Sequence, residues 1–408
     1  MMRVSVIIPA WNLWDMTAAC LRSLAEHSVG EHIEVLVVDN GSEDATATEL
    51  EPLGHSLFGT AFKALHLPHN MGFARACNAG ATAAAGELLF FLNNDTVCTA
   101  GWLTPLRAAF ADASVGAAGP LLLYPDGSVQ HCGICFGPFG HVEHLYEFFP
   151  SDHPALCRER PLQAITGAAL MTRRCHFDSC GGFYTAYING WEDLDFCFSL
   201  RNLGLLLRVV PHSQFYHHTS CTPGRFVHES ANSRLFLQRW GQHVYPDLHL
   251  FAHADGFFME SDAQLHTWLC LSEQRRCALK TFLEKPLDLD RLRALLHQEP
   301  LWLDGWLELI GRKEKEGNLQ QAMCLCEECI RLFDLPVVRK QMLRLLRMSG
   351  RQQALACYLQ DLRNVEERQD DAFRYKTRVK AALKKAETRE DKLLGEMLQG
   401  WLQRYGSL

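Results

Sequence analysis

The chain has 408 residues, of which 48% are hydrophobic and 21% are charged, and its formal net charge is −7. This length allows two or three domains of ordinary size, and the composition is that of a globular protein rather than a disordered one. The acidic balance argues against a general nucleic-acid binder, so no nucleic-acid partner is expected.

The 16 cysteines are scattered along the whole chain, whereas disulfide scaffolds are short and secreted. The segment from Met1 to Pro9 has the pattern of a strand rather than of a secretory leader. No apolar run reaches the roughly 18 residues of a membrane span. These features predict a reduced, cytoplasmic protein without a transmembrane segment, and they leave peripheral membrane contact open.

The first hundred residues alternate short apolar runs with helical patterns. Strands are expected at 4–9, 33–38, 62–67 and 87–92, and helices at 17–27, 42–50 (capped by Ser42), 73–85 and 102–110. Strands buried on both faces and separated by helices predict a parallel sheet in an α/β domain. Ligands bind such sheets at the carboxyl ends of the strands. Those ends carry Trp11 and Asn12, Asp39 and Asn40, Asn70, and the run from Asn93 to Asp95.

The second half of the chain changes character twice. From residue 116 to about 163, glycine, proline and histidine blur the pattern, which predicts irregular structure with hairpins left open. A helix is expected at 192–202 and a strand at 205–210. Beyond about residue 270 the chain is rich in Leu, Arg, Glu and Gln, which predicts helices. The predicted domains are 1–240 (α/β), 241–270 (a connecting segment) and 271–408 (all-α).

The helical part shows a weak internal repeat. Trp306, Leu309, Gly317, Ala322 and Cys329 have the spacing of a tetratricopeptide unit, and a fainter copy follows about one period later. A tetratricopeptide-like array and a plain helical bundle are equally favoured. Association into a homo-oligomer through these helices is left open.

Eight blocks in a fixed order resemble the family 2 glycosyltransferases, which have the GT-A nucleotide-sugar-binding, Rossmann-like fold. They are VSVIIPAWN (4–12), VLVVDNGSEDAT (35–46), NMGFARACNAG (70–80), LLFFLNNDT (88–96), ITGAALMTRR (165–174), GGFYTAY (181–187), WEDLDFCFSLRNLG (191–204) and YHH (216–218). The resemblance covers about residues 3–220. The pattern is most similar to the rhamnosyl- and galactofuranosyl-type branch, where the metal motif often reads Asn-x-Asp.

The resemblance implies a nucleoside-diphosphate sugar donor, linked to UDP or dTDP. A ribose diol suits a carboxylate such as Asp39, although that residue also fits a turn-forming aspartate. Trp191 is a candidate wall for a sugar ring, and Arg75 also fits an ordinary solvated arginine. The residues implied in donor binding are Pro9, Ala10, Trp11, Asn12, Asp39, Asn40, Asn70, Gly72, Arg75, Asn93, Asn94, Gly167 and Trp191.

Asn93, Asn94 and Asp95 form the candidate metal motif. Cleavage of a sugar–phosphate bond leaves negative charge on the diphosphate, and Mg²⁺ or Mn²⁺ stabilises that charge. These cations prefer oxygen ligands, so Asp95 is the expected first ligand. The alternative is a turn cluster at the end of a strand. The resemblance implies a histidine that completes the site, either His217 or His218, and the alternative is a surface pair.

Glu192, Asp193 and Asp195 form a second carboxylate cluster. An acceptor hydroxyl needs a base to take its proton as it attacks the sugar. The resemblance places this catalytic base at Asp193 and gives Glu192 a positioning role. The alternative is a charged first helical turn, which explains one acid better than three.

Two groups of cysteines have spacings that resemble metal motifs. Cys132 and Cys135 form a CxxC without a second pair, and Cys324, Cys326 and Cys329 lie inside a predicted helix. Packing as small apolar side chains is therefore the favoured interpretation.

These features predict an inverting, metal-dependent hexosyl- or deoxyhexosyltransferase. Protein O-glycosylation of a flagellin or bacterial surface protein is slightly preferred, because repeat arrays offer grooves for polypeptides. A glycan acceptor in lipopolysaccharide or polysaccharide synthesis is the alternative. A sugar-nucleotide pyrophosphorylase would need a glycine-rich basic loop where this chain has residues 9–12, and a non-catalytic scaffold would not need intact Asp95, Glu192 and Asp193.

Overall fold

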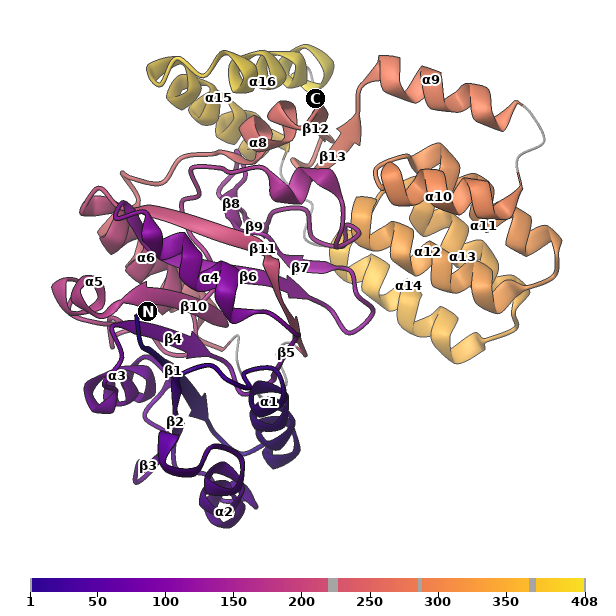
Figure 1. The fold of residues 1–408 in the computed structure, drawn as a ribbon. Helices are drawn as coiled ribbons and strands as arrows, with labels where there is room; N and C mark the ends of the chain where they lie inside the picture. The colour runs from indigo at the N-terminus through magenta and orange to yellow at the C-terminus, as the bar shows by residue number, and fades with distance from the viewer. Residues whose placement is uncertain (1, 219–226, 285–287, 367–371, 407–408) are drawn as a thin grey trace. The chain divides into compact units, whose positions relative to one another are not determined.

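The structure is a computed structural model that describes residues 2–218, 227–284, 288–366 and 372–406. The chain forms two compact units (Figure 1). The first comprises residues 1–135, 143–147 and 154–244, and the second comprises 136–142, 148–153 and 245–408. The second unit therefore includes two short segments from the first half of the chain.

The first unit is built on a nine-stranded sheet. Its strands are β1 (Val4–Ala10), β2 (Ile33–Asp39), β3 (Phe62–His66), β4 (Leu88–Leu92), β5 (Thr96–Cys98), β6 (Val115–Leu123), β7 (Val129–His131), β10 (Ala169–Arg173) and β11 (Leu206–His217). Their order is β3-β2-β1-β4-β10-β6-β11-β5, and β7 pairs with β6. The strands from β3 to β4 are parallel, whereas β10 is antiparallel to both its neighbours and β5 is antiparallel to β11. The prediction of an α/β domain is confirmed, and the four strands expected in the first hundred residues, β1 to β4, do pair in parallel. The complete sheet is mixed, because antiparallel strands from later in the chain extend it.

Helices cover both faces of this sheet. One face carries α1 (Trp14–Glu26), α2 (Thr46–Phe58) and α4 (Leu103–Ala108), and the other carries α3 (Phe73–Ala83), α5 (Arg174–Ser179) and α6 (Glu192–Asn202). A further helix, α7 (Glu229–Trp240), packs against α6.

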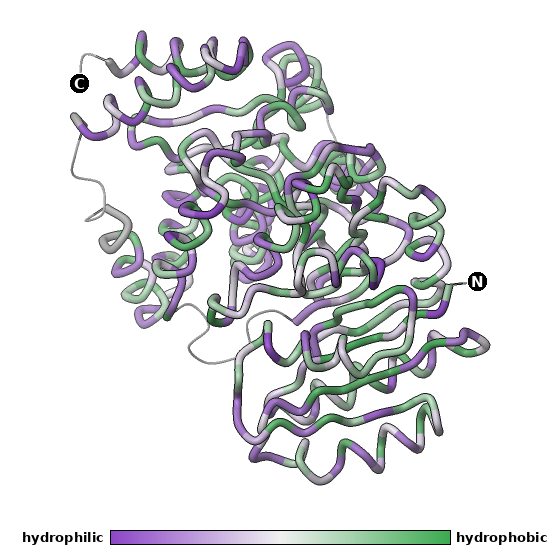
Figure 2. The backbone as a smooth tube through the Cα atoms, turned by 90° about the vertical axis from the view of Figure 1, so that its left-hand side faces the viewer, coloured by the Kyte–Doolittle hydropathy of each residue, from purple (hydrophilic) through white to green (hydrophobic). Residues whose placement is uncertain are grey.

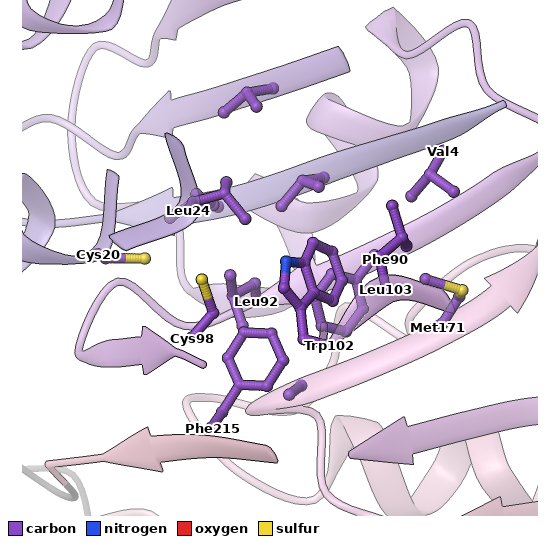
Figure 3. Close-up of a cluster of buried hydrophobic side chains, with 14 of the residues drawn as sticks. Val4, Cys20, Leu24, Phe90, Leu92, Cys98, Trp102, Leu103, Met171 and Phe215 are labelled. Atoms are coloured by element: carbon purple, nitrogen blue, oxygen red, sulfur yellow. The ribbon is translucent and has the colours of Figure 1, made fainter. Parts of the chain in front are cut away.

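A cluster of three aromatic rings lies in the core between the sheet and the helices α1, α2 and α4 (Figure 3). The fully buried Trp102 ring lies 5.2 Å from the Phe90 ring and 5.3 Å from the Phe215 ring. Burial of one such side chain contributes roughly 1.5–3 kcal/mol. The three rings join β4 and β11 to the start of α4, although these segments are distant in sequence.

Buried cysteines take part in the same packing. Cys20 and Cys98 lie in this core (Figure 3), and burial raises the pKa of both thiols to about 12. Cys132, Cys135, Cys326 and Cys329 are also buried, as their interpretation as small apolar groups requires, whereas Cys324 is exposed.

The segment expected to be irregular contains the longest fully buried strand of the sheet, β6. Sequence patterns missed it because Gly116, Gly119 and Pro120 interrupt its apolar run, and proline is normally confined to edge strands. Both glycines are required by close packing: a Cβ at Gly116 would lie 2.8 Å from Leu205, and one at Gly119 would lie 3.0 Å from the Ala169 carbonyl oxygen. β11 accommodates Pro120 through a register shift after Val210.

The second unit is mainly helical. It contains α8 (Leu248–Ala254), a hairpin of β12 (Phe257–Ser261) and β13 (Thr267–Leu271), α9 (Glu273–Leu283), α10 (Leu289–Gln298), α11 (Leu303–Lys315), α12 (Leu319–Phe333), α13 (Pro336–Met348), α14 (Gln352–Glu366), α15 (Ala372–Thr388) and α16 (Lys392–Tyr405). A short hairpin of β8 (Ile134–Phe136) and β9 (Val142–His144) has residues in both units. The expected connecting segment, 241–270, thus contains α8 and most of the β12–β13 hairpin.

Helices α11 to α14 pack consecutively against one another. α13 begins about one tetratricopeptide period of roughly 34 residues after α11, and α14 does so after α12. Hydrophobic and hydrophilic residues alternate along the helices of this unit (Figure 2), and α10 to α13 and α16 each bury several apolar side chains. The predicted helical region is present. Within the described ranges, none of the helices combines the length and apolar character needed to cross a bilayer.

Candidate active site

A cleft in the first unit lies at the carboxyl ends of β1 and β4. Ligands of open α/β sheets bind at this edge. The predicted residues that line it are Pro9, Ala10, Trp11, Asn40, Asn70, Asn93, Asn94, Asp95, Gly167, Glu192 and Asp193. Those that lie outside its lining are Asn12, Asp39, Gly72, Arg75, Trp191, His217 and His218. Sequence reasoning did not include the lining residues Phe73, Thr166, Asn189 and Gly190 among its site residues.

Asn12 joins two loops next to the cleft. Its Oδ1 accepts a hydrogen bond from the Glu43 backbone N–H (2.9 Å), and its own N–H donates to Ser42 Oγ (2.8 Å). Ser42 therefore does not cap a helix at residue 42, and α2 begins at Thr46 instead. The structure gives Asn12 a loop-joining role.

Asp39, at the end of β2, is buried and is held within its own turn. Its Oδ1 accepts from the Ser42 N–H (2.9 Å), and its Oδ2 lies 3.0 Å from Nδ1 of His66. That hydrogen bond raises the pKa of His66, with a smaller contribution from Glu51. The Asp39 carboxylate thus organises the turn behind the cleft.

Asn40 and Asn70 fix the turn that enters α3. The Asn40 side chain donates to Asn70 Oδ1 (2.9 Å) and accepts from the Met71 N–H (2.8 Å), while Asn70 Oδ1 also accepts from the Gly72 N–H (3.0 Å). Gly72 has a φ of 86°, a conformation that glycine adopts without strain.

Asn189 reaches the start of α3 from a distant loop. Its Oδ1 accepts from the Phe73 N–H at 3.3 Å, and both residues line the cleft. The positive end of an 11-residue helix therefore faces the cleft, and such helix ends favour negative charge. The Asn189–Gly190 pair is a turn signal directly before Trp191, and it was the sequence feature that could have revealed this residue. Arg75, two residues further along α3, is exposed and is not part of the lining.

The candidate metal motif is anchored at two points. The Asn94 side chain donates to Thr17 Oγ1 on α1 (2.8 Å), so it is engaged with that helix. The Asn93 backbone N–H donates to the Ala168 carbonyl (2.8 Å), which connects the end of β4 to the opposite wall.

The structure distinguishes the two candidate histidines. β11 pairs with β5, and this pairing brings buried His217 beside the metal motif: its Nε2 lies 3.1 Å from Asp95 Oδ1. His218 is exposed, and its backbone N–H donates to the Asp95 carbonyl (3.0 Å). His217 is therefore the histidine placed next to Asp95.

The surroundings of His217 suit a cation. Its Nδ1 lies 2.6 Å from Gln130 Oε1, and an amide oxygen only accepts, so Nδ1 carries the hydrogen. Nε2 is then the ring nitrogen that faces the Asp95 carboxylate, where either a proton or a metal cation satisfies both atoms. Among the described residues no three acidic, His or Cys side chains gather as metal ligands. Mg²⁺ binds through one or two carboxylates plus waters and substrate phosphates, so the pair of Asp95 and His217 fits such a cation.

Asp193, in the first turn of α6, lies on the opposite wall. Its Oδ2 accepts from the Gly167 N–H (2.7 Å), and its Oδ1 accepts from the Leu194 N–H (2.9 Å). The wall itself is fixed from behind, because buried His131 accepts at Nε2 from the Thr166 N–H (3.3 Å). Burial holds the pKa of His131 well below its usual value, so this ring is neutral and able to accept.

Glu192 is almost fully buried beside Asp193. Its Oε2 accepts from the Gly190 N–H at 2.7 Å, which fixes the turn that carries Asn189. The positive end of α6 stabilises negative charge on both acids. Burial raises the pKa of the neighbouring Cys77 thiol, and the charge of Glu192 is a second, smaller cause of the increase.

The other members of this segment have structural partners. Asp195 accepts from Arg239 Nε (2.6 Å), Trp240 Nε1 (2.8 Å) and the Tyr187 hydroxyl (3.0 Å), so it joins α6 to α7. Trp191 donates through Nε1 to Glu229 (2.9 Å). The carboxylate cluster of the sequence therefore divides into two acids at the cleft and one that links helices.

Comparison with known proteins shows which chains this one is similar to. Residues 5–134 match the family model "Glycosyl transferase family 2". The chain is 30% identical to the O-antigen biosynthesis protein RfbC of Myxococcus xanthus, over 54% of this chain and 18% of that protein. It is 29% identical to N-acetylglucosaminyl-diphospho-decaprenol L-rhamnosyltransferase of Mycobacterium tuberculosis, over 47% of this chain and 69% of that one.

Among solved structures, GalNAc-T7 with UDP, GalNAc and Mn²⁺ is similar with a TM-score of 0.49 and 17% identity, over 59% of this chain and 48% of that one. The chain spans less than a third of the length of the first two curated relatives that it matches. The family-model match shows that residues 5–134, in the first unit of this protein, belong to a glycosyl transferase family 2 domain.

Proposed function

We propose that this protein is an inverting, metal-dependent glycosyltransferase that moves a sugar from a nucleoside-diphosphate sugar to an acceptor hydroxyl. The observation that carries the proposal is the placement of Asp193 and Asp95 on the lining of one cleft, with His217 beside Asp95, at the carboxyl ends of β1 and β4. The family of the N-terminal domain supports the same reaction class.

In this proposal Asp193 is the catalytic base. It removes the proton from the acceptor hydroxyl while that oxygen forms a bond to the anomeric carbon of the donor. The bond from that carbon to the diphosphate oxygen breaks on the opposite side, and its electron pair leaves with the nucleoside diphosphate. A single displacement of this kind inverts the anomeric centre. The Gly167 N–H holds Asp193 Oδ2 in place at 2.7 Å.

The donor binds between the two walls. Asn40 and Asn70 shape the turn that aims the start of α3 at the cleft, and this helix end favours the negative diphosphate. Asp95 and His217 are the residues that would hold Mg²⁺ or Mn²⁺, which supplies stabilisation of the charge that develops on the leaving diphosphate. The donor base is proposed to be uracil or thymine.

A donor screen tests the proposal. Purified protein with Mn²⁺ is incubated with UDP-, dTDP- and GDP-linked sugars, and release of the nucleoside diphosphate is measured. We expect hydrolysis of one donor class, with turnover lost in Asp193→Asn while binding of the nucleoside diphosphate is retained. Binding of no nucleoside diphosphate in the presence of Mn²⁺ would instead favour a non-catalytic scaffold.

Two acceptor classes are each favoured by one observation. A protein acceptor is favoured by the helical repeat of α11 to α14, because such arrays bind polypeptides. A glycan acceptor of lipopolysaccharide or polysaccharide synthesis is favoured by the O-antigen and lipid-linked relatives. The donor identified in the screen, carrying a radiolabelled sugar, is incubated with a lysate of the source cell. Label in protease-sensitive material supports a protein acceptor, and label in solvent-extractable lipid supports a glycan.

A further inference from the structure

We propose that Gln130 is a positioning residue for the metal site, because it fixes the tautomer and the orientation of His217. This inference rests on the proposed function, since it concerns the metal that the transfer reaction requires. Gln130 lies on β7, a three-residue strand that the sequence pattern did not predict. It is 4% exposed and does not line the cleft.

Gln130 contacts His217 through both ends of its amide. Its Nε2 donates to the His217 backbone carbonyl at 3.0 Å, and its Oε1 lies 2.6 Å from the ring Nδ1 of the same residue. The two contacts determine each other. The carbonyl requires a donor, so the amide nitrogen must face it, and the amide oxygen is then the atom that faces Nδ1.

The contact at Nδ1 determines which atom the His217 ring offers on its other side. Because Nδ1 faces the amide oxygen, Nε2 is the ring nitrogen left to bind a metal, and it lies 3.1 Å from Asp95 Oδ1. Nε2 is buried and makes no hydrogen bond within the described part of the chain. Without Gln130, Nδ1 would lose its acceptor and the ring could rotate about its side-chain bonds, so Nε2 would no longer be held opposite Asp95. Gln130 therefore keeps the two ligand atoms of the pair in place.

This is the arrangement by which outer partners orient histidine ligands in metal sites, and their loss typically lowers metal affinity about 10- to 100-fold. The partner is unusual here, since one side chain holds both the ring and the main chain of the ligand. A carboxylate at position 130 would retain the contact with Nδ1–H but not the donation to the carbonyl. The two contacts can therefore be separated by substitution.

The experiment measures Mn²⁺ binding to the full chain, from the loss of the free Mn²⁺ signal in electron paramagnetic resonance, with and without saturating UDP. Gln130→Leu removes both contacts, and we expect its dissociation constant for Mn²⁺ to rise about 10- to 100-fold. Gln130→Glu should stay within a few-fold of the unsubstituted protein. Gln214→Leu is the matched control: it makes the same substitution in β11, where Gln214 contacts the Pro211 carbonyl at 3.3 Å, and its Mn²⁺ affinity should be unchanged.

Several results would overturn the inference. One is a folded Gln130→Leu protein that binds Mn²⁺ with unchanged affinity. Another is equal loss in Gln130→Glu and Gln130→Leu, because a purely structural role through the carbonyl contact predicts that outcome. Melting temperatures identify misfolded variants. Asp95→Asn and His217→Ala test the metal site itself: if both still bind Mn²⁺ normally, the metal part of the proposed function fails, whatever Gln130 does.

Discussion

Oδ2 of Asp193 accepts a hydrogen bond of 2.7 Å from the backbone N–H of Gly167. The two residues belong to different elements, because Asp193 lies in the first turn of α6 and Gly167 precedes β10. Their contact forms one wall of the cleft. It fixes one oxygen of the proposed base, and the position of that base determines which acceptor hydroxyl can react.

Replacement of the base should abolish transfer without loss of the donor. Asp193→Asn keeps the shape of the side chain but cannot take a proton, and general-base catalysis contributes roughly 10²- to 10⁴-fold. We expect kcat to fall by about that factor, with nucleoside-diphosphate affinity unchanged in isothermal titration. Asp178→Asn, an exposed substitution on α5, is the control. Unchanged turnover in Asp193→Asn would remove this residue from the mechanism.

A methyl group at position 167 should displace the base. The Cβ of an alanine there would lie 2.9 Å from the Cβ of Asp193, closer than real Cβ atoms approach. We expect Gly167→Ala to reduce kcat strongly while circular dichroism shows a folded protein. Gly311→Ala, in a helix with open space around the position, is the control and should stabilise by up to about 1 kcal/mol. Normal turnover of Gly167→Ala would show that Asp193 need not occupy this position.

Asp195 should matter for stability. Asp195→Asn replaces a buried carboxylate, which accepts from Arg239, Trp240 and Tyr187, with a neutral amide. We expect the free energy of unfolding, measured by urea denaturation, to fall by about 1–3 kcal/mol. The exposed ion pair between Asp112 and Arg208 is the comparison, since Asp112→Asn at this solvent-screened site should cost much less stability than Asp195→Asn. Equal costs at the two sites would contradict the linking role of Asp195.

The aromatic group in the core should be costly to disrupt. Trp102→Ala removes a fully buried ring that packs on Phe90 and Phe215, and losses of about 3–5 kcal/mol are typical of such changes. Denaturant unfolding measures the effect. Leu203→Ala, at a side chain that is 51% exposed, should change stability by less than about 0.5 kcal/mol.

His66 should make stability depend on pH. Its hydrogen bond to Asp39 raises its pKa above the ordinary value of 6.5. A raised pKa means that the folded protein binds the proton more tightly than the unfolded chain does. The stabilisation is therefore complete below about pH 6.5 and is lost as the pH rises through the raised value.

The measurement compares the free energy of unfolding of the unsubstituted protein with that of His66→Gln between pH 5.5 and 9. The difference should be largest at the acidic end and shrink as the pH increases. In an Asp39→Asn background the pH-dependent part should be much smaller, because the first cause of the shift is removed. If the difference in the free energy of unfolding between the two proteins grew with pH, it would contradict a raised pKa for His66.

The sequence predicted much of the first unit because its signals are local. The apolar runs of β1, β2 and β4 are continuous, and each is followed by polar residues at a strand end. The helix at 192–202 was predicted with the boundaries that α6 has. β6 and β10 could not be placed in the sheet, because glycines and a proline break the pattern of β6, and antiparallel insertion depends on partners far along the chain.

Candidate residues were recognised by their type, but their roles depend on where neighbouring segments place them. The sequence by itself determined that acids and amides follow the strand ends and that Glu192, Asp193 and Asp195 begin one helix. Only the tertiary structure decided that Asp195 faces Arg239, that His217 rather than His218 lies beside Asp95, and that Gln130 holds that histidine. The physical reason is that the hydrogen-bond partners of these residues come from strands and loops tens of residues away. The spacing of residues along the chain cannot predict such distant partners.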